Sequence, residues 1–278
     1  MQLFSSWTGS DFLILYTVLL AAGCAGAWVI PQRLRARGRA GDAPDVESAA
    51  LLAGGRTRLA EAVLTDLYVR GGIVAASDGR LVVARHDIAA SPAGQALLAL
   101  DPPLTLRAAG RALGVHAERL AARLRRSGLM MWPDVHWRLR WLSLAPFAAL
   151  LVLGLYRQRA GTAEGEPTGP LVVLLGVTLG LAVIRFAVSD PRTRAGIDAV
   201  RRLRARTGRG AGAIRADTAA MAVALHGTSV LAGTRWEPLH ALRLAAADNG
   251  GSGADGGSGD WGDASCDSGG GDGGSCGD

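Results

Sequence analysis

The sequence is poor in the residue types on which most enzyme sites and disulfide scaffolds depend. It has three cysteines and five histidines in 278 residues. It also has no lysine, but we draw no functional meaning from this, because arginine in place of lysine is typical of a GC-rich genome. Three cysteines, two of them near the C-terminus, do not make a disulfide framework. The histidines are scattered, and neither they nor the cysteines have metal-ligand spacing. We therefore expect no catalytic, cofactor-binding or metal-binding residues, and a protein that is not an enzyme.

Three long apolar segments are the clearest feature that is present. Residues 12–30 carry no charge and would extend about 28 Å as a helix, enough to cross the hydrocarbon core. Residues 141–156 are shorter, and Pro146 is expected near their first turn, where a missing amide is tolerated. Residues 170–188 carry one charge, Arg185, close enough to the end to reach the headgroups. We predict three transmembrane helices. Arginines follow the first segment rather than precede it, which favours an uncleaved anchor over a signal peptide.

Small residues in these segments indicate close contact between helices. Gly23 and Gly26 interrupt the first segment, and Gly176 and Gly180 form a Gly-x-x-x-Gly pair in the third. The favoured interpretation is helix packing among the three spans of one chain, and the alternative is self-association into a homo-oligomer. No span holds a central acidic residue, histidine or paired polar site, which argues against a transporter or proton relay.

Arginine is distributed unevenly about the three segments. None precedes the first segment, whereas Arg33, Arg35, Arg37 and Arg39 follow it directly. Arginine-rich flanks also precede the second segment and follow the third, and the loop 157–169 is neutral. Positively charged flanks remain in the cytoplasm. We therefore predict a multi-pass inner (plasma) membrane protein with its N-terminus, residues 1–11, outside the cell. Residues 31–140 and 189–278, and so the C-terminus, would be cytoplasmic.

Residues 44–133 are the candidate cytoplasmic domain, too small for a large catalytic cleft. Apolar spacing predicts helices at 47–55 and 56–70, then a hairpin of strands 73–75 and 81–83 about the turn 77–79. Helices at 91–100, 104–114 and 116–127 follow. Two helix ends that enter apolar segments, at 64–74 and 120–130, are typical of a winged-helix-like fold. The predicted fold class is mainly α, with three transmembrane helices, this small α+β domain and a disordered tail.

Residues 189–247 are predicted to be cytoplasmic basic and apolar helices. In the helix 190–209, Ile197, Val200 and Leu203 share one face and arginines cover the others. This helix could lie on the inner leaflet against anionic lipid, or pack on the domain 44–133. Residues 218–233 are apolar but too short to cross the membrane, so we expect a short buried or interfacial helix rather than a fourth span.

The C-terminal segment 248–278 has 13 glycines, seven aspartates and five serines and no basic residue. Such a composition cannot bury enough apolar surface to offset the entropy of ordering, so we predict a disordered acidic tail. Because the whole chain has a net charge of +6, residues 1–247 carry +13. Cys266 and Cys276 are candidate modification sites, since two thiols alone are an incomplete metal site.

Several short segments together suggest a family. They are LLAGGR (51–56), LTDLYVRGGIV (64–74), LRRSGLMM (124–131), DPRTR (190–194) and VALHGTSVLAG (223–233). With the glycine-rich tail, they resemble an uncharacterised family of bacterial, mainly actinobacterial, membrane proteins with a Gly/Cys/Ser-rich low-complexity C-terminus. The resemblance covers most of residues 44–278 and implies a membrane protein of unknown function.

These features favour a non-enzymatic membrane scaffold or interaction protein. Its partners would be the lipid bilayer and an unknown cytoplasmic protein. The alternative is a membrane-tethered winged-helix transcriptional regulator that reads DNA through the arginines of residues 116–126. The simpler interpretation of those arginines is a solvated face near the second span, so we do not expect nucleic acid as a partner. A membrane-bound enzyme is the third alternative.

Overall fold

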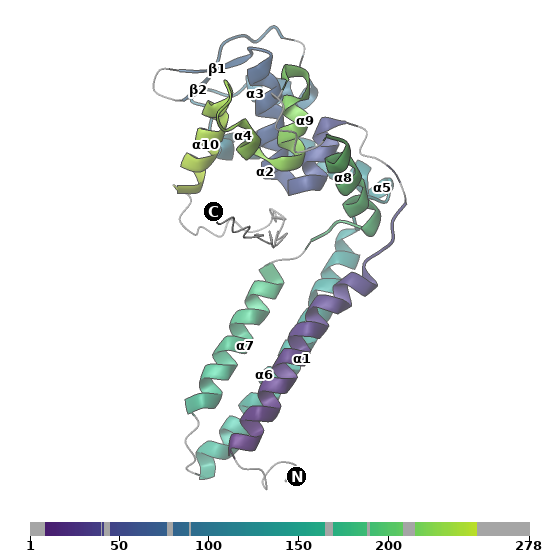
Figure 1. The fold of residues 1–278 in the computed structure, drawn as a ribbon, viewed down its shortest axis with the longest axis vertical. Coiled ribbons are helices and arrows are strands. Elements are labelled where there is room, and N and C mark those ends of the chain that lie inside the picture. The colour runs from purple at the N-terminus through teal and green to yellow at the C-terminus, as the bar shows by residue number, and fades with distance from the viewer. Residues whose placement is uncertain are drawn as a thin grey trace, which may run out of the picture.

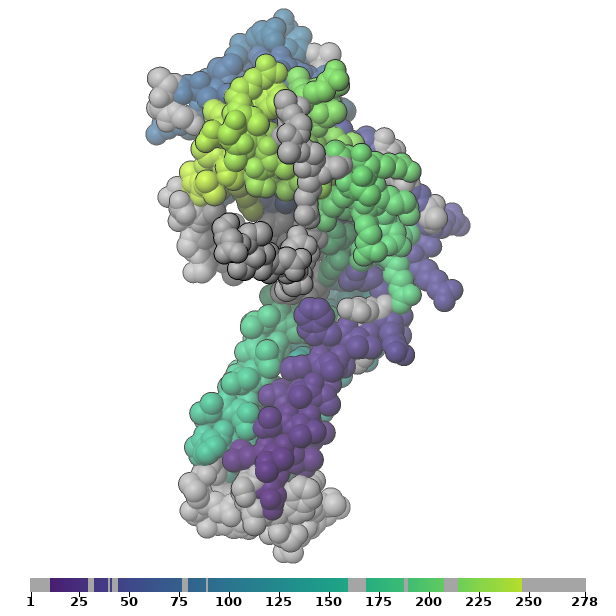
Figure 2. All heavy atoms as spheres, viewed as in Figure 1, coloured from purple at the N-terminus to yellow at the C-terminus, as the bar shows by residue number. Residues whose placement is uncertain are grey.

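The computed structural model describes residues 9–39, 41, 45–76, 80–88, 90–164, 169–187, 190–207 and 215–248. These residues are mainly helical, with one two-stranded sheet. Three long helices form a narrow bundle, and the remaining elements form a wider domain at one end of it (Figures 1 and 2). The predicted turn 77–79 and the tail beyond residue 248, with Cys266 and Cys276, lie outside the described residues.

The bundle consists of α1 (Gly9–Leu34), α6 (Pro133–Glu164) and α7 (Gly169–Ala187). Each helix is long and apolar enough to cross a membrane, which confirms the prediction of three spans in a multi-pass membrane protein. The second helix begins earlier than predicted. Pro146 therefore lies in the interior of α6 rather than in its first turn, and that expectation was wrong. Residues 133–140, in which charged and ionisable side chains alternate with apolar ones, continue the helix beyond the apolar run from which its start was inferred.

Aromatic, aliphatic and small side chains hold the three helices together. Phe12, Tyr16 and Leu20 of α1 pack against Phe147 and Leu150 of α6 and Leu171 and Leu175 of α7. The Tyr16 hydroxyl is 3.0 Å from the Thr178 hydroxyl, and both residues are fully buried. An added Cβ at Gly154 would lie 2.7 Å from Leu175 Cδ2, so the absence of a side chain there lets α6 approach α7 closely.

The domain begins with α2 (Val46–Val69), which bends where two predicted helices met. Gly54 and Gly55 have non-helical backbone angles, and Gly55 has φ of 70°, a conformation that favours glycine. The strands β1 (Ile73–Ala75) and β2 (Leu81–Val83) pair antiparallel, as predicted. The short helices α3 (Pro92–Leu98) and α4 (Leu106–Ala112) follow, and then α5 (Gly114–Arg126).

The segment after the third span completes this same domain. It forms α8 (Arg194–Thr207), α9 (Ala216–His226), the 3₁₀ turn η1 (Thr228–Leu231) and α10 (Glu237–Asp248). One hydrophobic core joins Leu52 and Leu64 of α2 to Val200 of α8 and to Val223 and Leu225 of α9. Residues 46–130 and 195–239 therefore fold together, and α8 packs its apolar face on the domain rather than on lipid. The predicted apolar segment 218–233 forms most of α9 and η1 and packs into this core, whereas α10 falls within the helices predicted for 189–247 without having been given bounds.

A buried carboxylate ties α2 to α10. The side chain of Glu61 is 3% exposed, and its two oxygens accept ion pairs from Arg58 at 3.3 Å and Arg243 at 3.2 Å. The guanidinium of Arg58 also occupies the space that a side chain at Gly227 would need. Both arginines remain partly exposed. They therefore reach inward from the domain surface and neutralise the buried carboxylate of Glu61.

Candidate functional site

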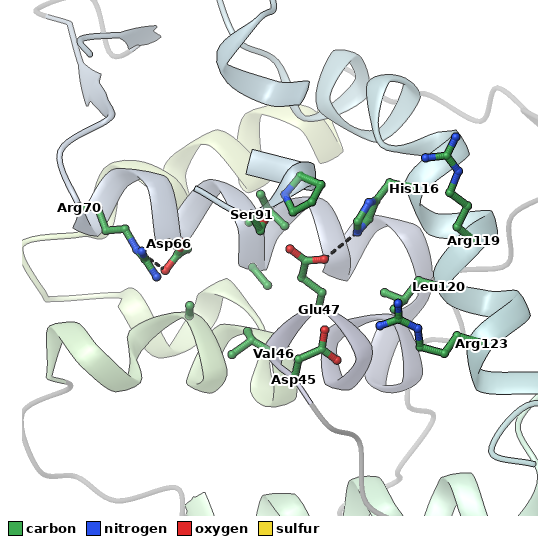
Figure 3. Close-up of a pocket in the computed structure, with 14 residues that line it drawn as sticks. Asp45, Val46, Glu47, Asp66, Arg70, Ser91, His116, Arg119, Leu120 and Arg123 are labelled. Atoms are coloured by element: carbon green, nitrogen blue, oxygen red, sulfur yellow. Dashed lines mark hydrogen bonds and ion pairs between the residues drawn. The ribbon is translucent and has the colours of Figure 1, made fainter. Parts of the chain in front are cut away.

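A cleft of about 530 Å³ opens on the domain between α2 and α5 (Figure 3). Ser91 and Pro92, at the start of α3, and Ala220 of α9 complete its walls. The lining is partly apolar, with Val46, Ala62, Val63, Pro92, Leu120 and Ala220, and partly charged. Such a mixture is typical of a binding site, in which apolar area supplies affinity and a few polar groups supply orientation.

The N-terminus of α2 forms one end of the cleft. Asp45 caps this helix, because its carboxylate accepts a hydrogen bond from the Ser48 amide at 3.3 Å. In the first turn, Glu47 Oε2 is 2.6 Å from His116 Nε2 of α5, and Figure 3 shows the imidazole pointing to the carboxylate. This contact joins two helices across the cleft. The Glu47 carboxylate is therefore already bound to a side chain of the protein itself.

A second pair engages another carboxylate of the lining. Arg70 Nε donates to Asp66 Oδ1 at 2.9 Å, one helical turn earlier in α2. Among the cleft acids, Asp45, Glu47 and Asp66 are thus all used in contacts within the domain.

The arginines of α5 are the charged groups of the cleft that remain available. Arg119 and Arg123 are exposed, four residues apart and on one face of α5. Within the described part of the chain, neither guanidinium has an ion pair with a carboxylate. Arg123 extends from α5 toward the cleft in Figure 3. Because the acids are occupied and two cations are free, the cleft favours an anionic group that lies beside apolar surface.

A carboxylate that is hydrogen-bonded to a histidine can also orient the imidazole as a general base. His116 and Glu47 have that arrangement, but in the described residues no hydroxyl or thiol hydrogen-bonds to His116. The hydroxyl of Ser91 instead accepts the Gly94 amide at 3.1 Å and caps α3. Histidine, cysteine and acidic side chains of the described residues do not gather in groups of three that could hold a metal ion.

The domain is fixed to the bundle where the three chain connections meet, at residues 35–39, 128–131 and 190–195, which we call the junction. Backbone amides of Met131, Thr193, Arg194 and Ala195 donate to carbonyls of Pro191, Leu129, Ala36 and Arg37, respectively. Asp190 accepts from Arg35 at 3.3 Å and from Arg192 at 3.0 Å. Arg192 also donates to the Leu52 carbonyl of α2 at 3.2 Å. The domain is therefore held to all three helices by specific hydrogen bonds.

The structure places the predicted packing glycines differently. Gly176 and Gly180 lie on the exposed face of α7, and no atom is within 4 Å of a Cβ built at either position. In the described part of the bundle, close contacts occur at Gly23, which was noted from sequence, and at Gly154, which was not.

Sequence reasoning also missed the cleft. Glu47 and His116 are 69 residues apart, and no local pattern links them. The spacing of Arg119 and Arg123 on one helical face was visible, but the apolar wall beside them depends on how α2, α3 and α9 pack.

No protein-family model matches the sequence, and no curated protein or solved structure shows a significant similarity to it.

Proposed function

We propose that the protein is a non-enzymatic membrane adaptor whose domain binds an acidic segment of a partner protein in the α2–α5 cleft. The observation that carries the proposal is the position of Arg119 and Arg123 beside an apolar wall. Within the described residues, neither arginine forms an ion pair with an acidic side chain. A carboxylate of the partner would meet the guanidinium groups while apolar side chains next to it cover Val63 and Leu120. Short acidic peptides with apolar neighbours have this chemistry.

The junction supports the role of an adaptor. Hydrogen bonds from three chain segments fix the domain to the bundle, so a partner bound in the cleft would be held at a defined place next to the membrane. We also propose membership of the actinobacterial membrane-protein family. Three of the segments that carry this resemblance meet at the junction, through Leu52, Leu129 and Arg192.

Photo-crosslinking tests the cleft directly. A crosslinking residue at Val115, exposed on α5 beside His116, should form an adduct with the partner in intact cells, and one at Leu244 on α10 should not. The double variant Arg119→Glu/Arg123→Glu should remove the adduct, because like charges repel an acidic segment. The matched variant Arg111→Glu/Arg235→Glu changes the same charge elsewhere and should retain it. An adduct that survives the first variant, or forms equally at Leu244, would overturn the proposal.

The arginine distribution supports an orientation in which the N-terminus is outside and the domain and tail are cytoplasmic. Cys266 and Cys276 provide a direct test with native residues. A membrane-impermeant maleimide should label the tail only after the cells are permeabilised, and the variant Cys266→Ser/Cys276→Ser should lose that labelling. Labelling of unbroken cells at these thiols would place the tail outside.

A membrane-tethered winged-helix regulator is the second candidate. Arg126 extends the exposed arginine face of α5, which favours it. The described hairpin, however, precedes α4 and α5 in the chain, and Met130 after α5 pairs with Arg192 instead of with the sheet. The test needs the full chain in detergent, because residues 195–239 contribute to the domain core. We expect no retention of duplex DNA at low salt. Salt-sensitive binding that Arg119→Gln/Arg123→Gln weakens would favour the regulator.

A further inference from the structure

Exposed aromatic rings mark one depth at the domain end of the bundle. Trp137 and Trp141 of α6 stack with ring centroids 6.3 Å apart, and Phe186 of α7 is within 6.2 Å of both. The neighbouring Arg185 donates to the carbonyl of Ala27 at 3.1 Å, which places Trp28 of α1 at about the same level. Trp28 is 68% exposed and Trp141 is 60% exposed. Tryptophan rings with this placement lie among lipid headgroups.

Exposed arginines gather at this aromatic level and just beyond it, on the side of the domain. We call them the arginine band: Arg33, Arg37 and Arg39 after α1, Arg138 of α6, and Arg194 and Arg202 of α8. Three chain segments contribute, and hydrogen bonds hold them together. Arg194 donates to the Arg33 carbonyl at 3.1 Å, and Arg202 donates to the Gly41 carbonyl at 3.0 Å. These bonds fix the guanidinium groups of Arg194 and Arg202 and hold the backbone from which Arg33 extends.

The acidic residues that the structure describes beside the band do not balance it. Asp190 is already bound by Arg35 and Arg192. Asp198 is 3.7 Å from Arg201, which lies outside the band. In the described residues, Arg33, Arg37, Arg39 and Arg138 have no carboxylate partner. A positive excess thus remains at the level where headgroups begin.

The packing of α8 limits how it can meet a membrane. Ala195, Ala199 and Val200 of this helix belong to the domain core and Leu203 packs against it, so only the half-buried Ile197 of its apolar face is left and little apolar surface can insert into lipid. Contact with a leaflet must be through guanidinium groups, which bind phosphate oxygens with charge-assisted hydrogen bonds. Because the tryptophans lie among the headgroups, the phosphate oxygens of the lipids are within reach of the arginines. A soluble partner would have to displace lipid to bind there.

We propose that the arginine band binds anionic phospholipid headgroups in the leaflet next to the domain and concentrates lipids such as phosphatidylglycerol around the protein. The site is separate from the α2–α5 cleft and does not depend on the function proposed for it. Basic clusters directly beside transmembrane helices attract anionic lipids in this way. Here the hydrogen bonds of the junction hold the contributing segments together, so the lipid would meet arginines on a fixed backbone.

Quenching of the protein's own tryptophans by brominated lipid measures this enrichment. The full-length protein is reconstituted in phosphatidylcholine vesicles that contain equal small fractions of brominated phosphatidylglycerol or brominated phosphatidylcholine. Because Trp28, Trp137 and Trp141 lie at the band, we expect a local phosphatidylglycerol fraction about two- to five-fold above the bulk, falling as salt is raised. Equal quenching by the two lipids would overturn the proposal.

Two variants with the same loss of charge separate the band from general electrostatics. Arg33→Gln/Arg37→Gln should abolish most of the enrichment, whereas Arg111→Gln/Arg235→Gln, in α4 and between η1 and α10, should leave it unchanged. An unchanged thermal unfolding midpoint shows that each variant is folded. Enrichment that both variants retain, or lose equally, would assign it to net charge and overturn the proposal. Competition by soluble glycerol phosphate at low concentration would also overturn it, because the ligand would then be a free phosphate ester.

Discussion

The bundle and the domain are both built of helices, but they expose opposite kinds of surface. In the bundle, only 28%, 22% and 17% of the apolar windows of α1, α6 and α7 are buried by protein. In the domain, Leu52, Leu59, Leu64 and Leu67 of α2 alone are almost completely buried. Lipid covers the rest of the bundle, so burial of apolar surface adds little to association of its helices. The domain instead depends on the hydrophobic effect in water.

This difference predicts where charge can stabilise the protein. The domain contains a buried carboxylate with two arginines, whereas in the middle of the bundle the neutral pair Tyr16 and Thr178 joins α1 to α7, and the arginines Arg157 and Arg185 lie toward the ends of their helices. Close approach is also achieved differently. Glycine at position 154 lets helices meet side by side, whereas Gly196 of α8 lies against the backbone of a neighbouring segment.

The largest expected effect is at the buried carboxylate. Glu61→Ala should lower the free energy of unfolding of the domain by about 3 kcal/mol, because Arg58 and Arg243 lose the charge that they share. Glu118→Ala is the matched control. Its carboxylate pairs with Arg56 at the surface, and removal should cost at most about 1 kcal/mol. Thermal unfolding in detergent, with hydrogen exchange of α2 and α10 peptides, measures both. Equal losses would mean that burial does not distinguish the two acids.

Backbone contact between α8 and the segment after α5 gives the next effect. A Cβ at Gly196 would lie 2.2 Å from the Leu129 carbonyl oxygen, so Gly196→Ala must move one backbone. We expect a loss of about 1–3 kcal/mol. Gly110→Ala in α4 meets no atom within 4 Å and should stabilise the domain by up to about 1 kcal/mol through helix propensity. The sign difference between the two variants is the readout, and a harmless Gly196→Ala would contradict the described junction.

The bundle and the domain differ in how much of their structure could be predicted from the sequence. The spans follow from the length of uncharged runs, and the hairpin 73–75/81–83 follows from short β-rich segments about a turn signal. The union of residues 46–130 and 195–239 in one core does not, because two transmembrane helices separate the segments. The pairing of His116 with Glu47 is likewise a product of tertiary packing.

The glycines of the bundle also show that a sequence pattern does not predict tertiary contacts. The Gly-x-x-x-Gly pair at positions 176 and 180 has the sequence pattern of a packing motif, but it faces outward. The glycine that does pack closely against neighbouring helices, Gly154, belongs to no such motif. A pattern identifies small residues, whereas the rotation of the helix about its axis decides what they contact.

Substitution by leucine tests the difference between the packed glycine Gly154 and the outward-facing glycine Gly176. Gly154→Leu should separate α6 from Tyr16 and Leu175 and destabilise the bundle by about 1–3 kcal/mol. Gly176→Leu should leave the bundle unchanged, because its side chain would enter lipid. Hydrogen exchange of α1 and α6 peptides reports on the bundle, and chemical crosslinking reports on the oligomeric state. A monomeric Gly176→Leu variant of an oligomeric wild type would show that the outward face joins copies of the chain.

The smallest effect should come from the polar contact in the bundle. Tyr16→Phe removes one partner of the 3.0 Å contact, but the Thr178 hydroxyl still donates to the Leu174 carbonyl at 2.8 Å. No donor is left without a partner, so we expect a loss of only about 0.6 kcal/mol, typical of hydrogen bonds between membrane helices. Thr178→Val should be worse, because it leaves the buried Tyr16 hydroxyl without its partner. Thermal unfolding of the two variants and their combination gives the coupling energy. If Tyr16→Phe were as damaging as Glu61→Ala, the bundle would depend on polar contacts as much as the domain does, and the contrast between the two regions would fail.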